Sequence, residues 1–336
     1  MVIALSIIAA LIVLATIYLA SLDGNYRIRR GLQINAPVKQ VFAVIRDLKT
    51  WPEWSPWLLH DPETKIVYSK DCNQEGGFYS WDGMAVGAGK LTHLKINPES
   101  SIDQQIEFIR PFKSFNQVNW YFENKNGSTV IEWEMIGCMP FLLRFMKKQI
   151  EPMISKDYDL GLALLNGYLL PAVPHPAISF CGRESLDNFQ YWSIPFSGNL
   201  REMQTLRKTG LIALETAAGE NAGLGLTIYR QIDWRQSHYQ GEIAVPVTES
   251  STQSNYTNRQ FEGGDYYKVE VRGDHNFLPL AWYAAFSHCR MHKIRLDKSR
   301  PSLEIYHNNP EAIDDSNTIK TILYVAVKKA PKKMAG

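Results

Sequence analysis

The amino-acid sequence predicts an α+β protein with three parts: an N-terminal transmembrane helix, a domain in which an antiparallel sheet wraps on a long C-terminal helix, and a duplicated α+β domain. Three observations lead to this prediction. The chain opens with a long uncharged stretch, its middle contains strand-like segments followed by a long helical stretch, and its second half contains an internal repeat. Helices and strands are told apart by their hydrophobic periods of about 3.6 and 2 residues.

The composition is that of a globular protein and disfavours several classes of function. Of the 336 residues, 45% are hydrophobic and 21% are charged, which argues against extensive disorder. Lys and Arg (36) nearly balance Asp and Glu (34) for a formal net charge of +2, whereas nucleic-acid binders usually carry a clear basic excess. We therefore expect no nucleic-acid partner. The cysteines form no CxxC pair and indicate neither a zinc ribbon nor a disulfide framework; they are Cys72, Cys138, Cys181 and Cys289.

Residues 1–25 are predicted to form a membrane anchor. The run Val2–Leu22 contains no charged residue, and 21 residues at about 1.5 Å each span the roughly 30 Å hydrocarbon core of a bilayer as a helix. The alternative is a cleaved signal peptide, which normally has a basic segment before its apolar run. Here the basic residues follow the run, as Arg27, Arg29 and Arg30. The positive-inside rule then predicts a single-pass protein of the inner or plasma membrane with its C-terminal bulk in the cytoplasm.

The next segment, residues 26–170, is predicted to contain a strand, a helix, about six antiparallel strands and a long helix. Ile28–Ile34 alternates in polarity, and Asn35 can cap the helix that Pro37 begins. The later elements are the strand-like segments 66–68, 77–81, 89–96, 102–109, 116–123 and 129–136, then a helical stretch over 141–169 that must restart or kink at Pro152.

Several short motifs of this segment occur together in one known superfamily. They are Ile34–Val38, Val41-Phe42, Trp51–Trp57, Tyr79–Gly83, Val86–Lys90, Arg110–Phe112, Thr129–Trp133 and Gly161-Leu162. With them, residues 26–170 resemble the SRPBCC (polyketide cyclase/START-like) superfamily. The resemblance implies a helix-grip fold that encloses a pocket for a hydrophobic small molecule. It assigns no single activity, because members include carriers, sensors and enzymes.

A proline-rich linker, residues 171–176, leads to the second domain, since its three prolines cannot donate backbone hydrogen bonds and disfavour helix before them. The second domain is predicted over residues 177–330, followed by a basic tail over 331–336. Within it, Leu226–Tyr229 recurs as Leu303–Tyr306. A duplicated strand–helix–strand–strand unit builds a pseudo-symmetric sheet with a groove between its halves. The flanking helical stretches are 199–217 and 277–292, and the closing strands are Ile243–Val247 and Ile322–Val327.

The second domain also carries motifs of a known family. They are Phe261–Val271, Gly273-Asp274, Leu280–Tyr283 and the most diagnostic stretch, Pro301–Pro310. Residues 175–328 thus resemble the GyrI-like effector-binding domain, the ligand-binding domain of AraC-type transcription activators. The resemblance implies recognition of amphipathic or cationic drug-like molecules in the central groove, while some members are hydrolases that open cyclopropane-bearing toxins.

Glu304 is the main candidate for a ligand-binding residue. Strand alternation places Glu304 and Tyr306 on one face, and the corresponding position in the first repeat is Thr227, so only one half of the groove carries the acid. A carboxylate beside aromatic rings suits a lipophilic cation, because the rings add cation–π attraction. The alternative is an ordinary solvent-facing glutamate. Candidate ligand-binding aromatic residues, each of which could instead belong to the core, are Tyr229, Trp234, Tyr267, Trp282, Tyr283 and Tyr306 in the second domain and Trp54, Trp57 and Trp81 in the first.

Two other patterns give weaker signals. His288 and His292 are spaced like metal ligands on a helix, but they lie at its C-terminal end, where cations are favoured by the helix dipole. Gly87–Thr92 lacks the residues that a phosphate-binding loop needs. We therefore expect neither a metal nor a cofactor. The cluster of Trp51, Trp54, Trp57 and Trp81 lines the cavity mouth, touches the bilayer interface or closes the core beneath its loop.

Three hypotheses of function follow from the sequence. The leading one is a non-catalytic, membrane-anchored protein that binds hydrophobic or amphipathic small molecules, cationic ones included, as a carrier, a sensor or a sequestering protein. The second is a hydrolase or cyclase for a small hydrophobic or electrophilic substrate, in which Glu304 activates water with Tyr267 or Tyr306 as its hydrogen-bond partner. The third is a ligand-sensing transcription regulator without a DNA-binding domain of its own, since the first domain stands where a helix-turn-helix would be.

Overall fold

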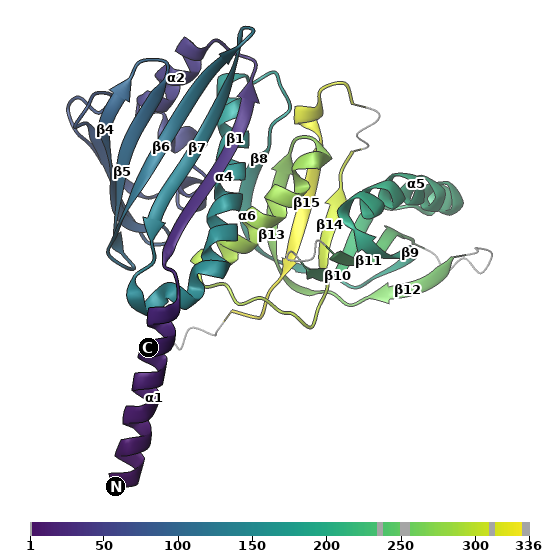
Figure 1. Cartoon of the computed structure of the whole chain (residues 1–336). Coiled ribbons are helices and arrows are strands. Elements are labelled where there is room, and N and C mark those ends of the chain that lie inside the picture. Colours follow the sequence, from purple (N-terminus) through teal and green to yellow (C-terminus); the bar gives the residue numbers. More distant parts are fainter. Residues whose placement is uncertain (1, 234–237, 249–255, 309–312, 331–336) are drawn as a thin grey trace, which may run out of the picture. The chain divides into compact units, whose positions relative to one another are not determined.

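The computed structural model describes residues 2–233, 238–248, 256–308 and 313–330 (Figure 1). The chain divides into two compact units, Met1–Val173 and Pro174–Gly336, so the boundary falls inside the proline-rich segment. Three features named in the sequence analysis lie outside the described residues: Trp234, the Asn309-Pro310 end of the repeat motif and the basic tail over 331–336.

Helix α1 (Val2–Ser21) opens the first unit. Its described side chains are nearly all exposed, and the stretch Ile3–Ser21 is long and apolar enough to cross a membrane. The hydroxyl of Thr16 donates a hydrogen bond to the carbonyl of Ile12 at 2.8 Å, so this polar side chain finds its partner within the helix. Strand β1 (Asn25–Ile34) follows after a short link.

The first unit is built on a seven-stranded antiparallel sheet in the order β1-β7-β6-β5-β4-β3-β2. Each of β2 to β7 pairs with the next strand in sequence, and β1 pairs with β7. All six strands predicted after the first helix are therefore confirmed. Asn126 and Gly127 have φ angles of 54° and 86°, as the tight β6–β7 hairpin requires. The strands are β2 (Lys65–Tyr68), β3 (Phe78–Gly83), β4 (Gly87–Asn97), β5 (Ser101–Arg110), β6 (Ser114–Lys125) and β7 (Ser128–Cys138).

Helix α2 (Val38–Arg46) confirms the predicted helix but not its predicted cap. Pro37 is the N-cap residue, and its backbone is extended, with ψ of 144°. The side chain of Asn35 instead accepts a hydrogen bond from the hydroxyl of Ser128 at 3.1 Å. Asn35 is thus held by the sheet, and the expectation that it caps the helix is wrong. Short helices α3 (Trp51–Trp54) and η1 (Leu58–His60) follow.

The long helix α4 (Lys147–Leu169) is preceded by the 3-10 helix η2 (Phe141–Met146). It continues through Pro152, so a new start at this proline is ruled out, while the alternative of a kink stays a prediction. Pro152 is the sixth residue of the helix, so its missing N–H leaves the carbonyl of Lys148 without the usual hydrogen bond from four residues on. Further along, α4 buries one apolar face, which includes Tyr158, Leu162, Leu165 and Leu169.

The second unit contains an eight-stranded antiparallel sheet in the order β12-β9-β11-β10-β14-β15-β13-β8. This order is symmetric about the β10/β14 pair, and each half has the strand–helix–strand–strand sequence predicted from the repeat. The outermost strands β8 and β12, which were not predicted, each pair with the other half. The strands are β8 (Ala177–Leu186), β9 (Phe189–Asn199), β10 (Leu226–Asp233), β11 (His238–Pro246), β12 (Thr257–Phe261), β13 (Gly264–Arg272), β14 (Ser302–Tyr306) and β15 (Lys320–Ala326).

The register at the centre of this sheet fixes the symmetry of the repeat. In the β10/β14 pair, Thr227 lies opposite Glu304, its own counterpart in the other copy. Equivalent residues can face each other across an antiparallel pair only where a local twofold axis passes between them. Glu304 therefore lies at the pseudo-twofold axis of the second unit.

The two repeats also start their helices alike. Asn199 and Glu202 form a capping box at the start of α5 (Leu200–Ala218), with hydrogen bonds of 3.0 and 2.9 Å. Asp274 accepts a hydrogen bond from the backbone of Asn276 at 2.7 Å and caps η4 (His275–Phe277), which leads directly into α6 (Leu278–Met291). Both predicted helical stretches of the repeat are confirmed within one or two residues.

Candidate functional site

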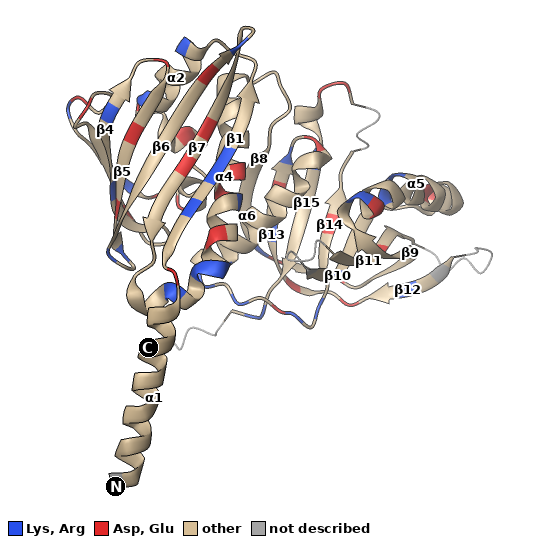
Figure 2. Ribbon diagram, viewed as in Figure 1, with Lys and Arg blue, Asp and Glu red and all other residues tan. Residues whose placement is uncertain are grey.

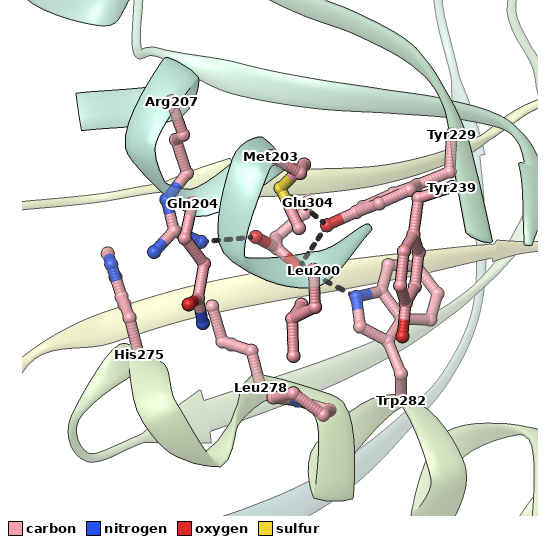
Figure 3. A pocket seen from close by; sticks show the side chains of 11 residues that line it. Leu200, Met203, Gln204, Arg207, Tyr229, Tyr239, His275, Leu278, Trp282 and Glu304 are labelled. Atoms are coloured by element: carbon pink, nitrogen blue, oxygen red, sulfur yellow. Dashed lines mark hydrogen bonds and ion pairs between the residues drawn. The ribbon is translucent and has the colours of Figure 1, made fainter. Parts of the chain in front are cut away.

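The side chain of Glu304 is buried between the sheet and both helices of the second unit. None of its surface is exposed, and side chains from α5 and α6 reach it (Figure 3). Both helices therefore cover the face of the sheet to which Glu304 points. Tyr306 lies on the same face, as alternation predicts, while the alternative of a solvent-facing glutamate is wrong.

Four donors satisfy the carboxylate of Glu304. Its Oε1 accepts hydrogen bonds from Arg207 Nη1 at 3.1 Å and from the hydroxyl of Tyr306 at 2.5 Å. Its Oε2 accepts from the hydroxyl of Tyr229 at 3.2 Å and from Trp282 Nε1 at 2.7 Å. An ionised carboxylate offers about four lone-pair sites. The acceptor capacity of Glu304 is therefore in use.

The four donors form two pairs related by the repeat. Tyr229 and Tyr306 occupy the same place in β10 and β14. Arg207 and Trp282 also correspond, since each lies eight residues after the residue that caps its helical segment. The two halves thus supply the same hydroxyl but different partners from their helices, a cation from α5 and an indole from α6.

The ion pair with Arg207 dominates the electrostatics of the site. Burial alone lowers the pKa of Arg207, but Tyr306, Glu304 and Tyr229 outweigh burial and raise it above its ordinary value. Burial and the charge of Glu304 raise the pKa of Tyr229 and Tyr306 well above the usual range, so both hydroxyls keep the protons that they donate. The guanidinium also lies 5.2 Å from the centroid of the Tyr306 ring.

His275 lies beside the ion pair at the start of the second helical segment. Its ring centroid is 5.2 Å from that of Tyr306, and its Nε2 is 3.2 Å from the hydroxyl oxygen of Thr321. Burial and the nearby charge of Arg207 lower the pKa of His275 to about 3. His275 is therefore neutral near pH 7, and Arg207 is the cation nearest to Glu304.

Two hollows adjoin this cluster. The inner one, over Glu304, has a volume of about 10 Å³, enough for about one water molecule. The outer cleft has a volume of about 520 Å³, which is within the range of small-molecule sites. Gln204, Arg207 and His275 line both hollows, so they separate the cleft from Glu304 (Figure 3). The cleft is further lined by Lys208, Leu211, Ile212, Glu215, Asp274, Tyr306, His307 and Asn308, among others.

The structure brings together only part of the predicted aromatic set of the second domain. Tyr229, Trp282 and Tyr306 meet at Glu304, whereas the hydroxyl of Tyr267 lies 2.9 Å from His288 Nε2. Tyr267 is therefore not the partner of Glu304 that the hydrolase hypothesis named, although Tyr306 is. Tyr283 follows Trp282 on α6 and does not line either hollow among the described residues.

Arg207 and His275 were missed by the sequence analysis. Arg207 lies on a helix whose inward face is fixed only by packing on the sheet. A signal for it does exist in the repeat, because the helical position that carries Trp282 in the second copy carries Arg207 in the first. His275 precedes α6 in a short 3-10 turn, outside the helical stretch that the sequence predicts over 277–292.

In the first unit, Trp54 and Trp81 are core residues, and Trp57 packs half-buried against the same core. Trp54 is 1% exposed and packs edge-on against Trp120 and Trp133, while Trp57 donates a hydrogen bond from Nε1 to Asp157 at 3.1 Å. Trp81 is 9% exposed and belongs to the same hydrophobic cluster. This packing fulfils the alternative in which these rings close the core.

A stack of three rings occupies the interior between the sheet and α4. The centroids of Trp120 and Trp133 are 4.5 Å apart, and those of Trp133 and Tyr158 are 3.8 Å apart. The two indole Nε1 atoms and the hydroxyl of Tyr158 are buried without a hydrogen-bond partner. Each such group costs about 1–3 kcal/mol when left unpaired. This interior therefore offers unused polar groups among aromatic surface.

The rings of His288 on α6 and of His292, its C-cap residue, contact other rings. The ring of His288 stacks on Phe180 at a centroid distance of 3.8 Å and lies 4.1 Å from the ring of His292. Among the described residues, no group of three or more His, Cys, Asp or Glu side chains could hold a metal ion.

Residues 27–169 match the family model described as "Polyketide cyclase / dehydrase and lipid transport". No protein of curated function is similar enough in sequence to this chain to count as a match. Among solved structures, CalU16 from Micromonospora echinospora is similar with a TM-score of 0.32 and 14% identity, covering 44% of this chain and 85% of CalU16.

Two further similar structures extend this comparison. SAV2435 bound to tetraphenylphosphonium has a TM-score of 0.35 and 18% identity, covering 44% of this chain and 92% of that chain. EcmrR in a complex with DNA has a TM-score of 0.38 and 14% identity, covering 57% of this chain and 73% of that chain.

Proposed function

We propose that the chain is a membrane-anchored binding protein for hydrophobic or amphipathic small molecules, with one ligand site in each unit. The second unit would be a GyrI-like effector-binding domain whose ligand enters the 520 Å³ cleft beside Arg207 and reaches toward Glu304. The observation that carries this proposal is a fully buried carboxylate at the repeat axis, enclosed by aromatic donors and separated from an open cleft by Arg207, Gln204 and His275.

The ion pair gives the site its preference for charge. Glu304 is neutralised by Arg207 in the ligand-free protein, so an amphipathic cation binds by taking the place of the guanidinium. The rings of Tyr229, Trp282 and Tyr306 then supply apolar surface and cation–π attraction. The displaced Arg207 lines the cleft, where Glu215 and Asp274 are carboxylates within the same wall. In such an exchange, the buried carboxylate of Glu304 is paired with a cation both before and after the ligand binds.

The first unit would hold the second ligand site. Its match to a family described by cyclases, dehydrases and lipid transport supports a small hydrophobic ligand. The unpaired polar atoms of Trp120, Trp133 and Tyr158 support a ligand that carries hydrogen-bonding groups on an apolar body.

The helix α1 would be the anchor, with the two units in the cytoplasm. Its support is the exposed apolar surface of Ile3–Ser21 and the basic residues Arg27, Arg29 and Arg30 that follow it. A reporter enzyme that is active only outside the cytoplasm, fused to the C-terminus, tests the orientation. We expect it to be inactive, and a cytoplasmic reporter at the same position to be active.

A fluorescent binding assay tests the site in the second unit. The full-length protein in detergent is titrated into rhodamine 6G or, by competition, tetraphenylphosphonium, with a neutral analogue of similar shape as the second probe. We expect saturable binding of the cation, with an affinity that is at least about tenfold lower in Glu304→Gln. A tenfold change in affinity corresponds to about 1.4 kcal/mol, which is less than the contribution of one hydrogen bond to a charged group.

Glu242→Gln is the matched control. Glu242 is also a buried carboxylate of the second unit's sheet, 3% exposed, and it accepts a hydrogen bond from the hydroxyl of Tyr191 at 3.0 Å. Because it lies opposite Ile228 in the β10/β11 pair, its side chain is on the face of the sheet away from the helices. Its replacement should leave cation binding unchanged. Equal affinity of wild type and Glu304→Gln for the cation would refute Glu304 as the counter-ion. Equal affinity of the wild type for the cation and the neutral analogue would refute the preference for cations.

A further inference from the structure

The 3-10 helix η2 carries an unusual amount of exposed apolar surface. Phe141, Leu142 and Phe145 are 40%, 70% and 54% exposed, although they lie within six residues of one another. Single exposed apolar residues are common on soluble proteins, but a contiguous group indicates a contact surface.

This surface adjoins the C-terminal end of α1. The guanidinium of Arg144 donates a hydrogen bond to the carbonyl of Leu22 at 3.2 Å, and Lys147 pairs with Asp23 at 2.9 Å. The backbone N–H of Met139 donates to the carbonyl of Gly24 at 2.9 Å. The segment η2 is thus tied to the residues that connect α1 to the sheet (Figure 1).

A second apolar turn lies at the same end of the sheet. Strand β1 begins at this end, β7 finishes there opposite it, and β6 therefore begins there too. The β5–β6 turn is consequently on the α1 side of the sheet. It contains Phe112, which is 57% exposed, next to Lys113.

The charges around both segments favour an anionic partner. In Figure 2, α1 has no charged residue, whereas basic residues occur where η2 passes into α4. The basic side chains are Arg144, Lys147 and Lys148 at η2 and Lys113 at the turn. Asp23 pairs with Lys147 and Glu107 with Lys113, so Arg144 and Lys148 are the cations of this set without a salt bridge among the described residues. Basic side chains beside exposed Phe and Leu are typical of segments that lie in the interface of an anionic bilayer.

We propose that η2 and the β5–β6 turn form a membrane seat: Phe141, Leu142, Phe145 and Phe112 enter the interfacial layer of the bilayer that α1 crosses, while Arg144 and Lys148 contact anionic headgroups. The proposal rests on the membrane anchoring proposed above. The seat holds one end of the first unit's sheet against the lipid surface, where hydrophobic ligands concentrate, and the link over 22–24 is too short to allow that end to move far from α1.

Site-specific fluorescence in vesicles tests the seat. The exposed thiols are first removed as Cys138→Ser and Cys181→Ser, and an environment-sensitive probe is attached to a new cysteine at Leu142→Cys or Phe112→Cys. The full chain is reconstituted in phosphatidylcholine–phosphatidylglycerol vesicles that contain a lipid with a nitroxide quencher near its headgroup. Leu94→Cys is the matched control, since Leu94 is 52% exposed on the same sheet but lies toward its other end. Leu11→Cys in the middle of α1 reports the anchor itself, in parallel vesicles whose quencher lipid carries its nitroxide deep in the acyl chain.

We expect several-fold stronger quenching and a blue-shifted emission at positions 142 and 112 than at 94. Replacing phosphatidylglycerol by phosphatidylcholine, or introducing Lys148→Glu, should reduce quenching at 142 without changing it at 11. Water-like emission at both 142 and 112 together with strong quenching at 11 would overturn the seat and leave the anchor standing. Absence of quenching at 11 would overturn the anchor, and the seat with it.

Discussion

Removing the guanidinium of Arg207 should destabilise the second unit more than its loss of contacts alone suggests. In Arg207→Met, the apolar stem is kept, but Glu304 stays buried with three neutral donors and no cation. Breaking a buried ion pair by removing one partner costs about 3–5 kcal/mol. For a unit of this size, each kcal/mol lowers the melting temperature by roughly 2–4 °C, so the transition of the second unit should fall by about 6–20 °C.

The assay is calorimetry of the detergent-solubilised full chain, with two matched variants. Lys208→Met removes the same charge from an exposed position next to Arg207 on α5, and its effect should stay within about 0.5 kcal/mol. The double variant Arg207→Met/Glu304→Gln removes both charges, so it should recover most of the lost stability. An amphipathic cation should also restore Arg207→Met, by about 2.7 kcal/mol at a hundred times its dissociation constant.

The reasoning would be refuted by either of two results. One is a melting temperature of Arg207→Met that equals that of Lys208→Met, because the ion pair would then contribute nothing. The other is a double variant that is less stable than Arg207→Met, because the unpaired charge of Glu304 would then not be the cause of the loss.

Three other predictions concern single side chains. The folded-state pKa of His275 is about 3, below the ordinary value of 6.5, so only the unfolded chain takes up this proton as pH falls below 6.5. The free energy of unfolding should therefore fall by up to about 1.4 kcal/mol per pH unit between pH 6.5 and 3. In urea unfolding, His275→Asn should flatten this slope. Tyr158→Phe removes a buried hydroxyl without a partner, so thermal unfolding should show no loss, or a gain of about 1 kcal/mol; a clear loss would mean that the hydroxyl is paired in solution. Asn199→Ala breaks the capping box of α5 and should cost about 1 kcal/mol, against little change for Thr209→Ala in the exposed middle of the helix; equal effects would contradict the role of the cap.

Elements with a strong local pattern could be predicted from the sequence. The six strands of the first unit after its first helix, the two helices of the repeat and the shared face of Glu304 and Tyr306 all follow from alternation, spacing and turn residues. Asn35 is the instructive failure. It has the residue type of a cap, but Ser128 on a strand 93 residues away offers its side chain a hydrogen bond, and only the fold brings these two together.

The same limit applies to the candidate site. The sequence could identify Glu304 because the repeat motif surrounds it, but the neutralisation of its charge depends on the inward face of α5. Arg207 is followed by Lys208, and nothing in the local pattern tells which of these two cations is buried. Packing of α5 on the sheet decides this, because Met203, Arg207, Gly210 and Leu214 form one buried face along the helix.

The pseudo-twofold axis explains why a duplicated unit carries a single acid. Thr227 and Glu304 face each other directly across an antiparallel pair, where Cβ atoms lie about 4.5–5.5 Å apart. A second carboxylate at position 227 would place two like charges in one buried site, and at least one of them would have to stay protonated. Thr227 instead lies 2.6 Å from the hydroxyl of Tyr306, which also donates to Glu304.

On the helices, too, one copy of the repeat carries the charge and the other a neutral residue, and here the charge is positive. The equivalent positions 207 and 282 both reach Glu304, one on each oxygen, and a second arginine at 282 would give a single carboxylate two buried cations. Trp282 supplies a neutral donor and a large ring in its place. The asymmetry thus puts the buried cation on one side of Glu304, that of Arg207, and this is the side that faces the open cleft.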